Sequence, residues 1–292
     1  MTTQTAATLN VQQTNSPRSF FAWLSPVAMV RNLWSHRGLV RQYAAREFRA
    51  RYRGQRLGLM WAVVTPLVML AIYTFIFGVV FKAKWGEQSG ATMGEAALQI
   101  FTGLLVFGVF REVVGHSPGL VLHQPQFVKR VVFPLEILPL CTMMNALVVL
   151  AIGSGVWLVG YAFIERAVPP LTILLVPVLV APVCLLALGL AWTLAAIGVF
   201  LRDISNMVEL SLTALFFLTP VFYSIERIPE PYRAIIGLNP IATVIESVRT
   251  ASIAGSVPDM TWFLPAAAAS CACAIFGYAV FMKARRAFAD VV

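Results

Sequence analysis

Four long stretches without a charged residue constrain the fold of this sequence more than any other feature. Residues 57–81, 137–164, 167–201 and 260–282 contain no Lys, Arg, Asp or Glu. A helix needs about 20 apolar residues to cross roughly 30 Å of hydrocarbon, and each stretch exceeds that length. A soluble fold would have to bury all four stretches completely. The sequence therefore predicts an all-α integral membrane protein.

The composition agrees with this assignment and excludes other classes. The chain is 59% hydrophobic and 12% charged, which is about half the charge of an average soluble domain. Its net charge of +9 comes from basic residues that flank apolar stretches, so we expect no nucleic-acid partner. Residues 1–19 are polar and lack an apolar run, which predicts a disordered tail and no cleavable signal peptide.

We predict six transmembrane helices, of which two are less clearly marked because charged residues border or interrupt them. Arg111 and Glu112 follow the core of the second predicted span, and Glu209 lies within the fifth. The predicted spans are 58–81, 97–115, 137–163, 171–200, 206–223 and 260–282.

The distribution of Lys and Arg predicts the orientation of these helices. If both chain ends are cytoplasmic, sixteen of the 22 basic residues lie inside and six lie outside. Cytoplasmic segments of membrane proteins carry such an excess of Lys and Arg. The expected topology is therefore N-in and C-in, which agrees with an even number of spans.

Residues 20–56 predict a cytoplasmic region that contains an amphipathic helix. Four residues at intervals of four form one stripe of that helix: Val40, Ala44, Phe48 and Tyr52. Four arginines cluster on another arc: Arg46, Arg49, Arg53 and Arg56. Such a helix is suited to lie on an anionic leaflet with its Arg side chains reaching the headgroups. The alternative is a cytoplasmic helix that merely follows the positive-inside bias.

Two connections between the predicted spans are long enough to carry structure. The cytoplasmic loop 111–136 carries polar side chains such as His123, Gln124 and Lys129 and holds three of the seventeen prolines. The external segment 224–259 contains the apolar pieces AIIGL and IATVI, which are too short to span but suit short re-entrant helices in the outer interface. An ordinary surface loop is the alternative for this segment.

Several kinds of chemistry are missing from the sequence. No G-x-x-x-x-G-K-[ST] motif occurs and none of the four Lys follows a Gly, so we do not expect this chain to bind ATP. The three His lack metal-ligand spacing, and we expect no metal, no cofactor and no catalytic residue here. Glu209 is expected to pack or pair near the cytoplasmic headgroups rather than to couple a proton.

Aromatic side chains within the spans provide candidates for a substrate path. A sugar ring offers an apolar face to an aromatic ring and demands no charge, although for each single residue packing is the simpler reading. The candidate residues are Trp61, Tyr73, Phe77, Phe216, Phe217 and Tyr223.

Four blocks of the sequence together resemble one known family, the permease subunits of ABC-2 type polysaccharide exporters. The blocks are REFRARYRGQRLGLMWAVVTPLVMLAIYTFIFGVVF (46–81), FVKRVVFPLEILPL (127–140), AAIGVFLRDISNMVEL (195–210) and LTPVFYSIERIPEPYRAIIGLNPIATVIESVR (218–249). They occur in the family's order and are distributed over residues 46–249, most of the chain. The O-antigen and teichoic-acid branch fits better than the group 2 capsule branch, chiefly through the RYRG and NP segments.

The resemblance implies an architecture, partners and a location. The chain would be a homodimeric transport subunit in the bacterial inner membrane, with residues 57–292 as its six-helix domain and residues 20–56 as an interfacial or gate helix region. Two copies of a cytoplasmic ABC ATPase would bind ATP and Mg²⁺. A lipid-linked glycan would pass between the two subunits, and the four clustered arginines would meet its pyrophosphate headgroup.

The resemblance also assigns roles to residues at matching positions. Residues in the loop 111–136 would couple the chain to the ATPase: Ser117, His123, Gln124, Gln126, Lys129 and Arg130. Residues in the segment 224–259 would form an external gate: Glu226, Arg227, Tyr232, Asn239 and Pro240.

Two alternatives from other classes stay open. A membrane-integral enzyme acting on polyprenyl-linked sugars would need clustered acids for a metal, whereas the available acids are dispersed in the sequence: Glu112, Glu136, Asp203 and Glu209. An ABC-2 permease for a drug or a lipid would show a closed apolar cleft, whereas a polymer exporter would show a wide aromatic channel.

Overall fold

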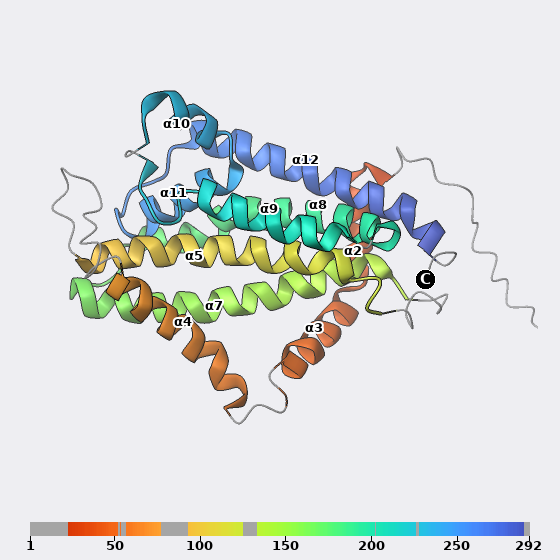
Figure 1. Ribbon diagram of the computed structural model, residues 1–292, viewed down its shortest axis with the longest axis horizontal. Coiled ribbons are helices and arrows are strands. Elements are labelled where there is room, and N and C mark those ends of the chain that lie inside the picture. The colour runs from red at the N-terminus through yellow and green to blue at the C-terminus, as the bar shows by residue number, and fades with distance from the viewer. Residues whose placement is uncertain are drawn as a thin grey trace, which may run out of the picture.

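The computed structural model describes residues 23–51, 53, 57–76, 93–124, 133–201, 203–225 and 228–288. All regular secondary structure in these ranges is helical (Figure 1), which confirms the all-α prediction. The α-helices are α2 (Pro26–Ser35), α3 (Arg37–Arg51), α4 (Trp61–Tyr73), α5 (Met93–His116), α7 (Leu138–Glu165), α8 (Val176–Phe200), α9 (Ile204–Leu218), α10 (Glu230–Gly237), α11 (Pro240–Ser252) and α12 (Met260–Ala284). The 3₁₀ helices are η1 (Gly58–Met60), η3 (Ser117–Gly119), η4 (Leu135–Ile137), η5 (Leu171–Leu175) and η7 (Arg285–Ala287).

Four helical segments in the described residues are long and apolar enough to cross a membrane. They are Gly94–Gly119, Leu135–Glu165, Leu171–Phe200 and Met260–Ala287. These segments confirm the predicted second, third, fourth and sixth spans as membrane-length helices.

The predicted first and fifth spans are shorter apolar helices, Trp61–Ile76 and Ile204–Leu218. Residues 77–81 of the first span lie outside the described residues, as does the predicted polar tail 1–19. The fifth span was predicted to reach residue 223, but its helix ends at Leu218. Thr219 takes an extended conformation directly before Pro220, and the residue preceding a proline disfavours the helical conformation.

The second span ends within one residue of its predicted bound, 97–115, and starts four residues earlier. The α5 helix continues through Arg111 and Glu112 to His116, so residues 111–116 of the predicted loop are helical. Two polar side chains within the last turns of a helix do not break its backbone hydrogen bonds. The change to the 3₁₀ helix η3 comes at Ser117 and Pro118, where proline removes a backbone donor.

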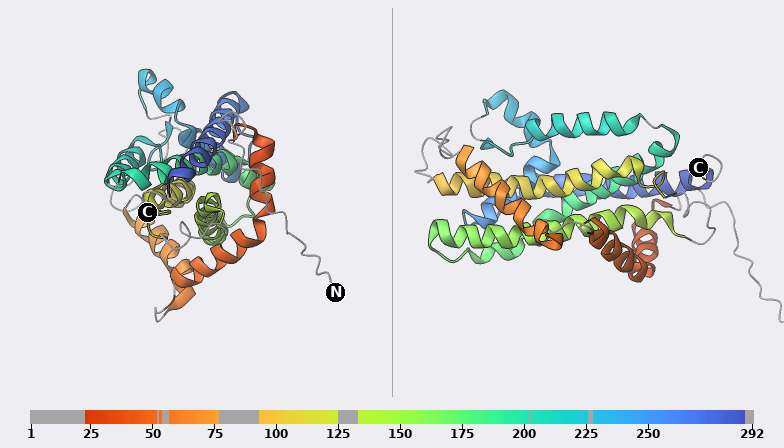
Figure 2. Two further views of the ribbon diagram at one scale, coloured as in Figure 1. Left: turned by 90° about the vertical axis from the view of Figure 1, so that its right-hand side faces the viewer. Right: turned by 60° about the horizontal axis from the view of Figure 1, so that its bottom comes forward.

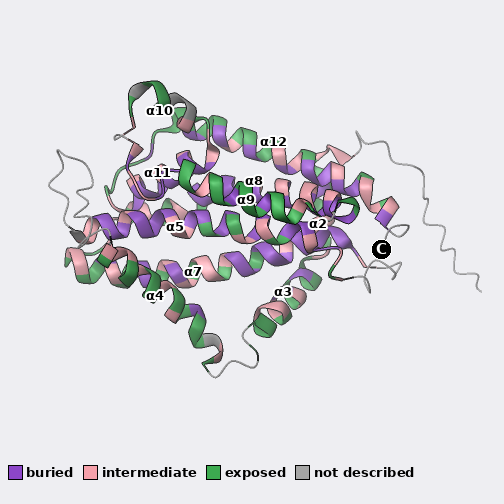
Figure 3. Ribbon diagram, in the orientation of Figure 1, coloured by how far each residue is buried: buried purple, intermediate pink, exposed green. Residues whose placement is uncertain are grey.

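The α5 helix lies at the centre of the bundle. In its most apolar stretch 67% of the residues are buried, against 22–33% in the other three membrane-length helices. Figure 3 shows α5 largely buried, while α4, α9 and α12 present exposed residues on their outer sides. The main hydrophobic core joins α5 to α7, α8 and α11.

The α8 and α12 helices approach each other until their backbones touch. A Cβ atom added at Gly277 would collide with the carbonyl oxygen of Gly189, and one added at Gly189 would collide with the carbonyl of Cys273. Small residues permit this approach, which is a common source of stability between helices in a membrane, where the hydrophobic effect does not drive helix association.

Two short helices, α10 and α11, lie at one end of the bundle, together with the start of α5 (Figure 1). We call this end the α10–α11 end. Their presence confirms that the segment 224–259 is helical rather than an ordinary loop. Asn239 caps α11, since its side chain accepts a hydrogen bond from the Ile241 amide at 3.0 Å, and Pro240 occupies the first helical position.

The guanidinium of Arg249 holds the α10–α11 end together from inside. Its Nε donates to the Gln99 carbonyl of α5 at 3.0 Å, and its two Nη atoms donate to the carbonyls of Pro220 at 2.8 Å and Val221 at 2.7 Å. Glu246 lies 3.5 Å from Nη1. Burial lowers the pKa of Arg249 to about 10, so the group still carries its charge at neutral pH.

The α2 and α3 helices lie at the opposite end, beside the end of α5 and the last turns of α12 (Figure 1). We call this end the α2–α3 end. Seen from this side, α2 and α3 run along the edge of the bundle (Figure 2). The predicted cytoplasmic segments that the structure describes therefore gather at one end, and α10 and α11 lie at the other.

The contact between α8 and α12 gives a first prediction. Gly277→Ala should lower the thermal unfolding temperature of the detergent-solubilised protein, because added volume at a close-packed site costs about 1–3 kcal/mol. Gly108→Ala on α5 is the matched control, since its Cβ would meet no atom within 4 Å. Intrinsic fluorescence during heating measures the unfolding temperature of each variant. Equal unfolding temperatures for the two variants would contradict the assigned contact.

Candidate functional site

The α3 helix is amphipathic in the way the sequence predicted. Val40 and Ala44 are buried and pack against Ile137 of η4 and Cys141 of α7. The arginines that the structure describes in the predicted cluster are exposed: Arg46, Arg49 and Arg53. Arg56 of the cluster and Tyr52 of the stripe lie outside the described residues. The helix thus buries one face on α7 and leaves its basic arc free of the core.

Two polar contacts tie α3 to the end of α5 and to the turn that follows it. The Tyr43 hydroxyl donates to Oε1 of Gln124 at 2.6 Å. Arg51 forms an ion pair with Glu112 in the last turns of α5. Burial raises the pKa of the Tyr43 hydroxyl, so it stays a hydrogen-bond donor at neutral pH. A displacement of the turn after α5 would therefore act directly on α3.

The turn after α5 lies firmly on α8. Ser117 is buried and donates to the Val114 carbonyl at 2.6 Å. A Cβ atom at Gly198, near the end of α8, would collide with the Pro118 carbonyl oxygen. Among the predicted coupling residues, Ser117 thus shapes the turn from inside, while His123 is exposed beside Gly119.

Of the remaining predicted coupling residues, only some lie in the described part of the chain. Gln124 is half-buried against Tyr43, whereas Gln126, Lys129 and Arg130 lie outside the described residues. The described residues therefore bring Ser117, His123 and Gln124 into one turn next to α3.

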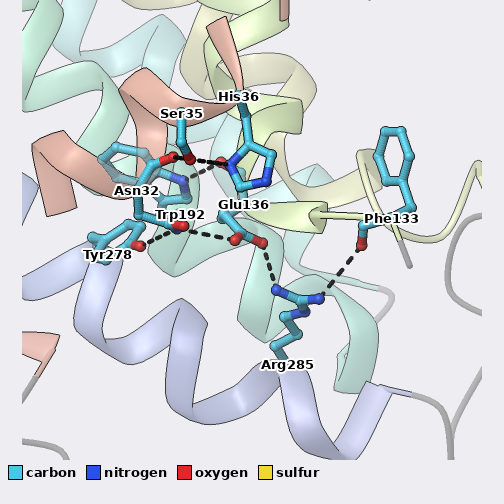
Figure 4. A network of polar contacts seen from close by, with 8 residues as sticks. All are labelled: Asn32, Ser35, His36, Phe133, Glu136, Trp192, Tyr278 and Arg285. Atoms are coloured by element: carbon cyan, nitrogen blue, oxygen red, sulfur yellow. Dashed lines mark hydrogen bonds and ion pairs between the residues drawn. The ribbon is translucent and has the colours of Figure 1, made fainter. Parts of the chain in front are cut away.

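A buried acid, Glu136, lies at the centre of a polar network at the α2–α3 end (Figure 4). Its Oε2 accepts from Nη1 of Arg285 at 2.7 Å, and its Oε1 accepts from the side-chain amide of Asn32 at 3.1 Å. The backbone carbonyl of Glu136 accepts from the indole nitrogen of Trp192 at 3.0 Å. Glu136 comes from η4, at the end of the predicted coupling loop, and its partners come from α2, α8 and η7.

Asn32 extends the network to α12. Its amide also donates to the Tyr278 hydroxyl at 2.7 Å, and its backbone carbonyl accepts from the Ser35 hydroxyl at 2.6 Å. The Tyr278 ring meets the Trp192 ring edge to face, with centroids 5.3 Å apart. The first helix of the described chain is thereby fixed to the ends of three membrane-length helices.

Sequence reasoning assigned no site role to Glu136, Arg285 and Asn32. The sequence does contain a signal for Glu136 and Arg285. Glu136 directly precedes the uncharged stretch 137–164, and Arg285 shortly follows the uncharged stretch 260–282. In a six-span topology these two span ends lie on the same side, where opposite charges can pair.

The predicted substrate-path residues separate into two groups. Tyr73 and Phe216 belong to one aromatic cluster, since each ring contacts Phe222, with centroids 5.9 Å and 5.0 Å apart respectively. The Phe217 and Tyr223 side chains adjoin this cluster. Trp61 lies twelve residues before Tyr73 on α4, about 18 Å away along a helix axis. Phe77 lies outside the described residues.

The predicted external-gate residues lie at the α10–α11 end as far as they are described. Tyr232 is exposed on α10, and Asn239 and Pro240 form the turn between α10 and α11. The Asn239 amide also donates to the Thr219 hydroxyl at 3.0 Å, which links this turn to the end of α9. Glu226 and Arg227 lie outside the described residues.

The α4 and α9 helices are among those that expose apolar residues in the single chain. On α9 the large exposed residues include Met207, Leu210 and Phe217, whose spacing places them on one face. On α4 they include Val63 and Leu67. These faces are surfaces for hydrocarbon or for another subunit, because water does not favour exposed apolar helix faces of this size.

The acids considered for an enzyme do not gather in one place. Across the described residues, no group of three His, Cys, Asp or Glu side chains could hold a metal ion. Glu112 pairs with Arg51, Glu136 pairs with Arg285, and Glu209 lies 3.8 Å from Arg111.

Comparison with known proteins gives consistent matches over most of the chain. It is 29% identical to the O-antigen export system permease protein RfbA of Myxococcus xanthus, over 91% of this chain and all of that protein. It is 26% identical to RfbA of Klebsiella pneumoniae, over 85% of this chain and 92% of that protein. The polysialic acid transport protein KpsM of Escherichia coli is 25% identical over 73% of this chain and 81% of that protein.

These relatives agree with the resemblance noted in the sequence. The O-antigen permeases match more of this chain than the polysialic acid transporter does, as the preferred branch predicts. The ABC-2 type transporter family matches residues 39–252, a range that includes most of α3 and every described helix from η1 to the end of α11. This chain, an integral protein of the bacterial inner membrane, belongs to the ABC-2 type transporter family.

Proposed function

We propose that this chain is the membrane subunit of an ATP-driven exporter that moves a lipid-linked, O-antigen-like polysaccharide across the inner membrane. The observation that carries the proposal is the junction of α3, η3 and Glu136 at the α2–α3 end. It links the segment after α5 to α2, α8, α12 and η7 through buried and partly buried hydrogen bonds. The names of the O-antigen and polysialic acid relatives support the substrate class.

The proposed topology has six spans with both chain ends in the cytoplasm. The shorter apolar helices Trp61–Ile76 and Ile204–Leu218 would complete the four membrane-length segments. The α2–α3 end would face the cytoplasm, because it holds the basic residues of α2, α3 and η7, in keeping with the positive-inside rule.

Coupling would come from a separate cytoplasmic ATPase, present in two copies. That partner would bind ATP and Mg²⁺ and would do the hydrolysis, since this chain has no P-loop motif. Movement of the ATPase would push on the exposed part of the turn after α5. The Tyr43–Gln124 bond and the Arg51–Glu112 pair would pass that displacement to α3.

Two copies of the chain would form the transport path between them. The exposed apolar faces of α4 and α9 are suited to this seam, because burying them would remove the largest unpartnered apolar surfaces of these helices. The aromatic cluster of Tyr73, Phe216 and Phe222 borders the same seam and offers ring faces to sugars. The turn at Asn239 and Pro240 would act in the outer gate.

Deleting the gene for this chain and purifying the tagged chain from native membranes together test the proposal. The deletion should remove the polysaccharide from the cell surface and leave its lipid-linked precursor on the cytoplasmic face. A P-loop ATPase should co-purify in equal amounts, and ATP hydrolysis should need both chains. Surface glycan is measured by immunoblot and precursor by mass spectrometry of lipid extracts.

Other outcomes would favour the alternatives. Normal surface glycan together with an altered resistance to a drug, or an altered lipid composition, would assign the chain to a different ABC-2 permease. A purified chain without an ATPase that chemically changes a polyprenyl-linked sugar would make it an enzyme.

The Glu136 network gives a second testable variant. Arg285→Met should reduce export and lower the unfolding temperature, because losing a charged partner leaves the buried Glu136 carboxylate under-satisfied at a cost of about 3 kcal/mol. Arg286→Met is the matched control, since Arg286 is exposed one residue further along. Adding Glu136→Met to Arg285→Met should restore part of the lost stability. If Arg285→Met and Arg286→Met have the same effect on export, the network has no role in coupling.

The basic arc of α3 gives a third variant, directed at the lipid-linked substrate. Arg46→Glu and Arg49→Glu should weaken export while dimer assembly stays intact, because the proposed contacts with a pyrophosphate headgroup depend on positive charge. Arg41→Glu serves as control, since Arg41 is exposed on another arc of the same helix. Export per assembled dimer is the readout. Unchanged export in Arg46→Glu and Arg49→Glu would reduce this cluster to a topology signal.

A further inference from the structure

A cavity of about 880 Å³ lies between α5, α7 and α8, away from the polar junction and the aromatic cluster. The η5 and α11 helices contribute to its wall at the α10–α11 end. Typical wall residues are Leu150 and Leu158 of α7, Ile173 of η5 and Val180 of α8. Its volume falls in the range of roughly 300–1,000 Å³ that is common for ligand sites.

Three polar side chains in the cavity wall already donate to the protein. The Thr102 hydroxyl donates to the Leu98 carbonyl at 2.8 Å, and the Trp157 indole nitrogen donates to the same carbonyl at 3.3 Å. The Ser252 hydroxyl donates to the Val248 carbonyl at 2.7 Å. These three groups have no donor hydrogen left for a polar ligand. Apart from Ser154 and Cys184 the rest of the wall is apolar, so the cavity is suited to an apolar occupant.

The exposed wall of the cavity belongs to membrane-length helices, so we expect the cavity to open toward hydrocarbon. Leu158 and Leu174 line the cavity and are also exposed on the outer surface, beside the exposed Phe163 and Val178. Both flanking helices, α7 and α8, belong to membrane-length segments. An apolar space in this setting is unfavourable for water and loses dispersion contacts when it is empty.

A positive charge lies beyond the outer end of the cavity. Arg166 is exposed at the end of α7, eight residues after Leu158, which is about 12 Å further along the helix axis. A phosphate in the headgroup layer would meet this guanidinium when a chain attached to it runs down into the cavity.

We propose that the cavity binds one acyl chain of a membrane phospholipid from the leaflet at the α10–α11 end, with the phosphate of that lipid near Arg166. The bound chain fills the gap between α7 and α8 and so forms part of the packing of the bundle. Phospholipids make up the surrounding leaflet, so they are the apolar molecules that meet the opening. This inference requires a membrane protein but not a particular exported substrate.

Gly155 is a position from which a larger side chain can fill the cavity without displacing neighbouring atoms. Gly155 lines the cavity, and a Cβ atom there would meet no atom within 4 Å, so Gly155→Leu places its side chain in the open space. Gly108→Leu is the matched control, because Gly108 also has open space around it and does not line the cavity. Ala181→Leu fills the cavity from α8 if Gly155→Leu does not fold.

The test reconstitutes the full chain in vesicles of phosphatidylglycerol that carry a photoreactive diazirine in one acyl chain. After illumination, mass spectrometry of peptides should place adducts on residues 147–158 and 173–185. Gly155→Leu or Ala181→Leu should lose these adducts, and Gly108→Leu should keep them. Arg166→Ala should weaken labelling by this anionic lipid.

Three results would overturn the proposal. Adducts that spread evenly over α7, α8 and α12 and survive Gly155→Leu would indicate ordinary bilayer contact. Cross-links from residues 147–158 to a second copy of the chain would show that protein covers the opening. Loss of the adducts on adding a small amount of polyprenyl phosphate would assign the cavity to an isoprenoid chain instead.

Discussion

Hydrocarbon offers no hydrogen-bond partner, and this constraint governs where polar groups lie in the chain. Within the membrane-length helices the hydroxyls of Thr102, Thr193 and Ser270 donate to carbonyls one turn back. The large polar side chains work at the two ends instead. Arg249 donates hydrogen bonds to three carbonyls at the α10–α11 end. Glu136 accepts hydrogen bonds from side chains of two other elements at the α2–α3 end.

The middle and the ends of the bundle therefore have different mechanical properties. Between the ends, α8 and α12 touch through the backbones of Gly189 and Gly277, a contact that leaves little freedom to slide. At the α2–α3 end, α3 is held by a few polar contacts such as the Tyr43–Gln124 bond and by a short apolar stripe. A push on this end is expected to move α3 and the turn after α5 before it distorts the middle of the bundle.

The sequence was sufficient to predict the membrane-length helices, because long uncharged stretches such as 137–164 and 260–282 are typical of helices that cross hydrocarbon. It was also sufficient to predict the apolar stripe of α3 through Val40 and Ala44, since a spacing of four residues is visible in the sequence itself. Helix ends were less predictable: α9 stops before Pro220 although its span was predicted to reach 223, and α5 begins at Met93 rather than at 97. The Glu136 network and the cavity at Gly155 arise from segments far apart in the chain, and spacing within one helix carries no information on them.

The outer surface of the bundle carries two kinds of apolar region, and their shapes suggest different occupants. The faces of α4 and α9 present side chains outward in rows, such as Met207 and Leu210, which another helix can pack against. The region between α7 and α8 is hollow, and a rigid helix backbone cannot follow such a hollow, whereas a flexible acyl chain can. A subunit that pairs through α4 and α9 would leave α7 and α8 facing the lipid. Dimerisation and lipid binding would then use separate faces of the same helical bundle.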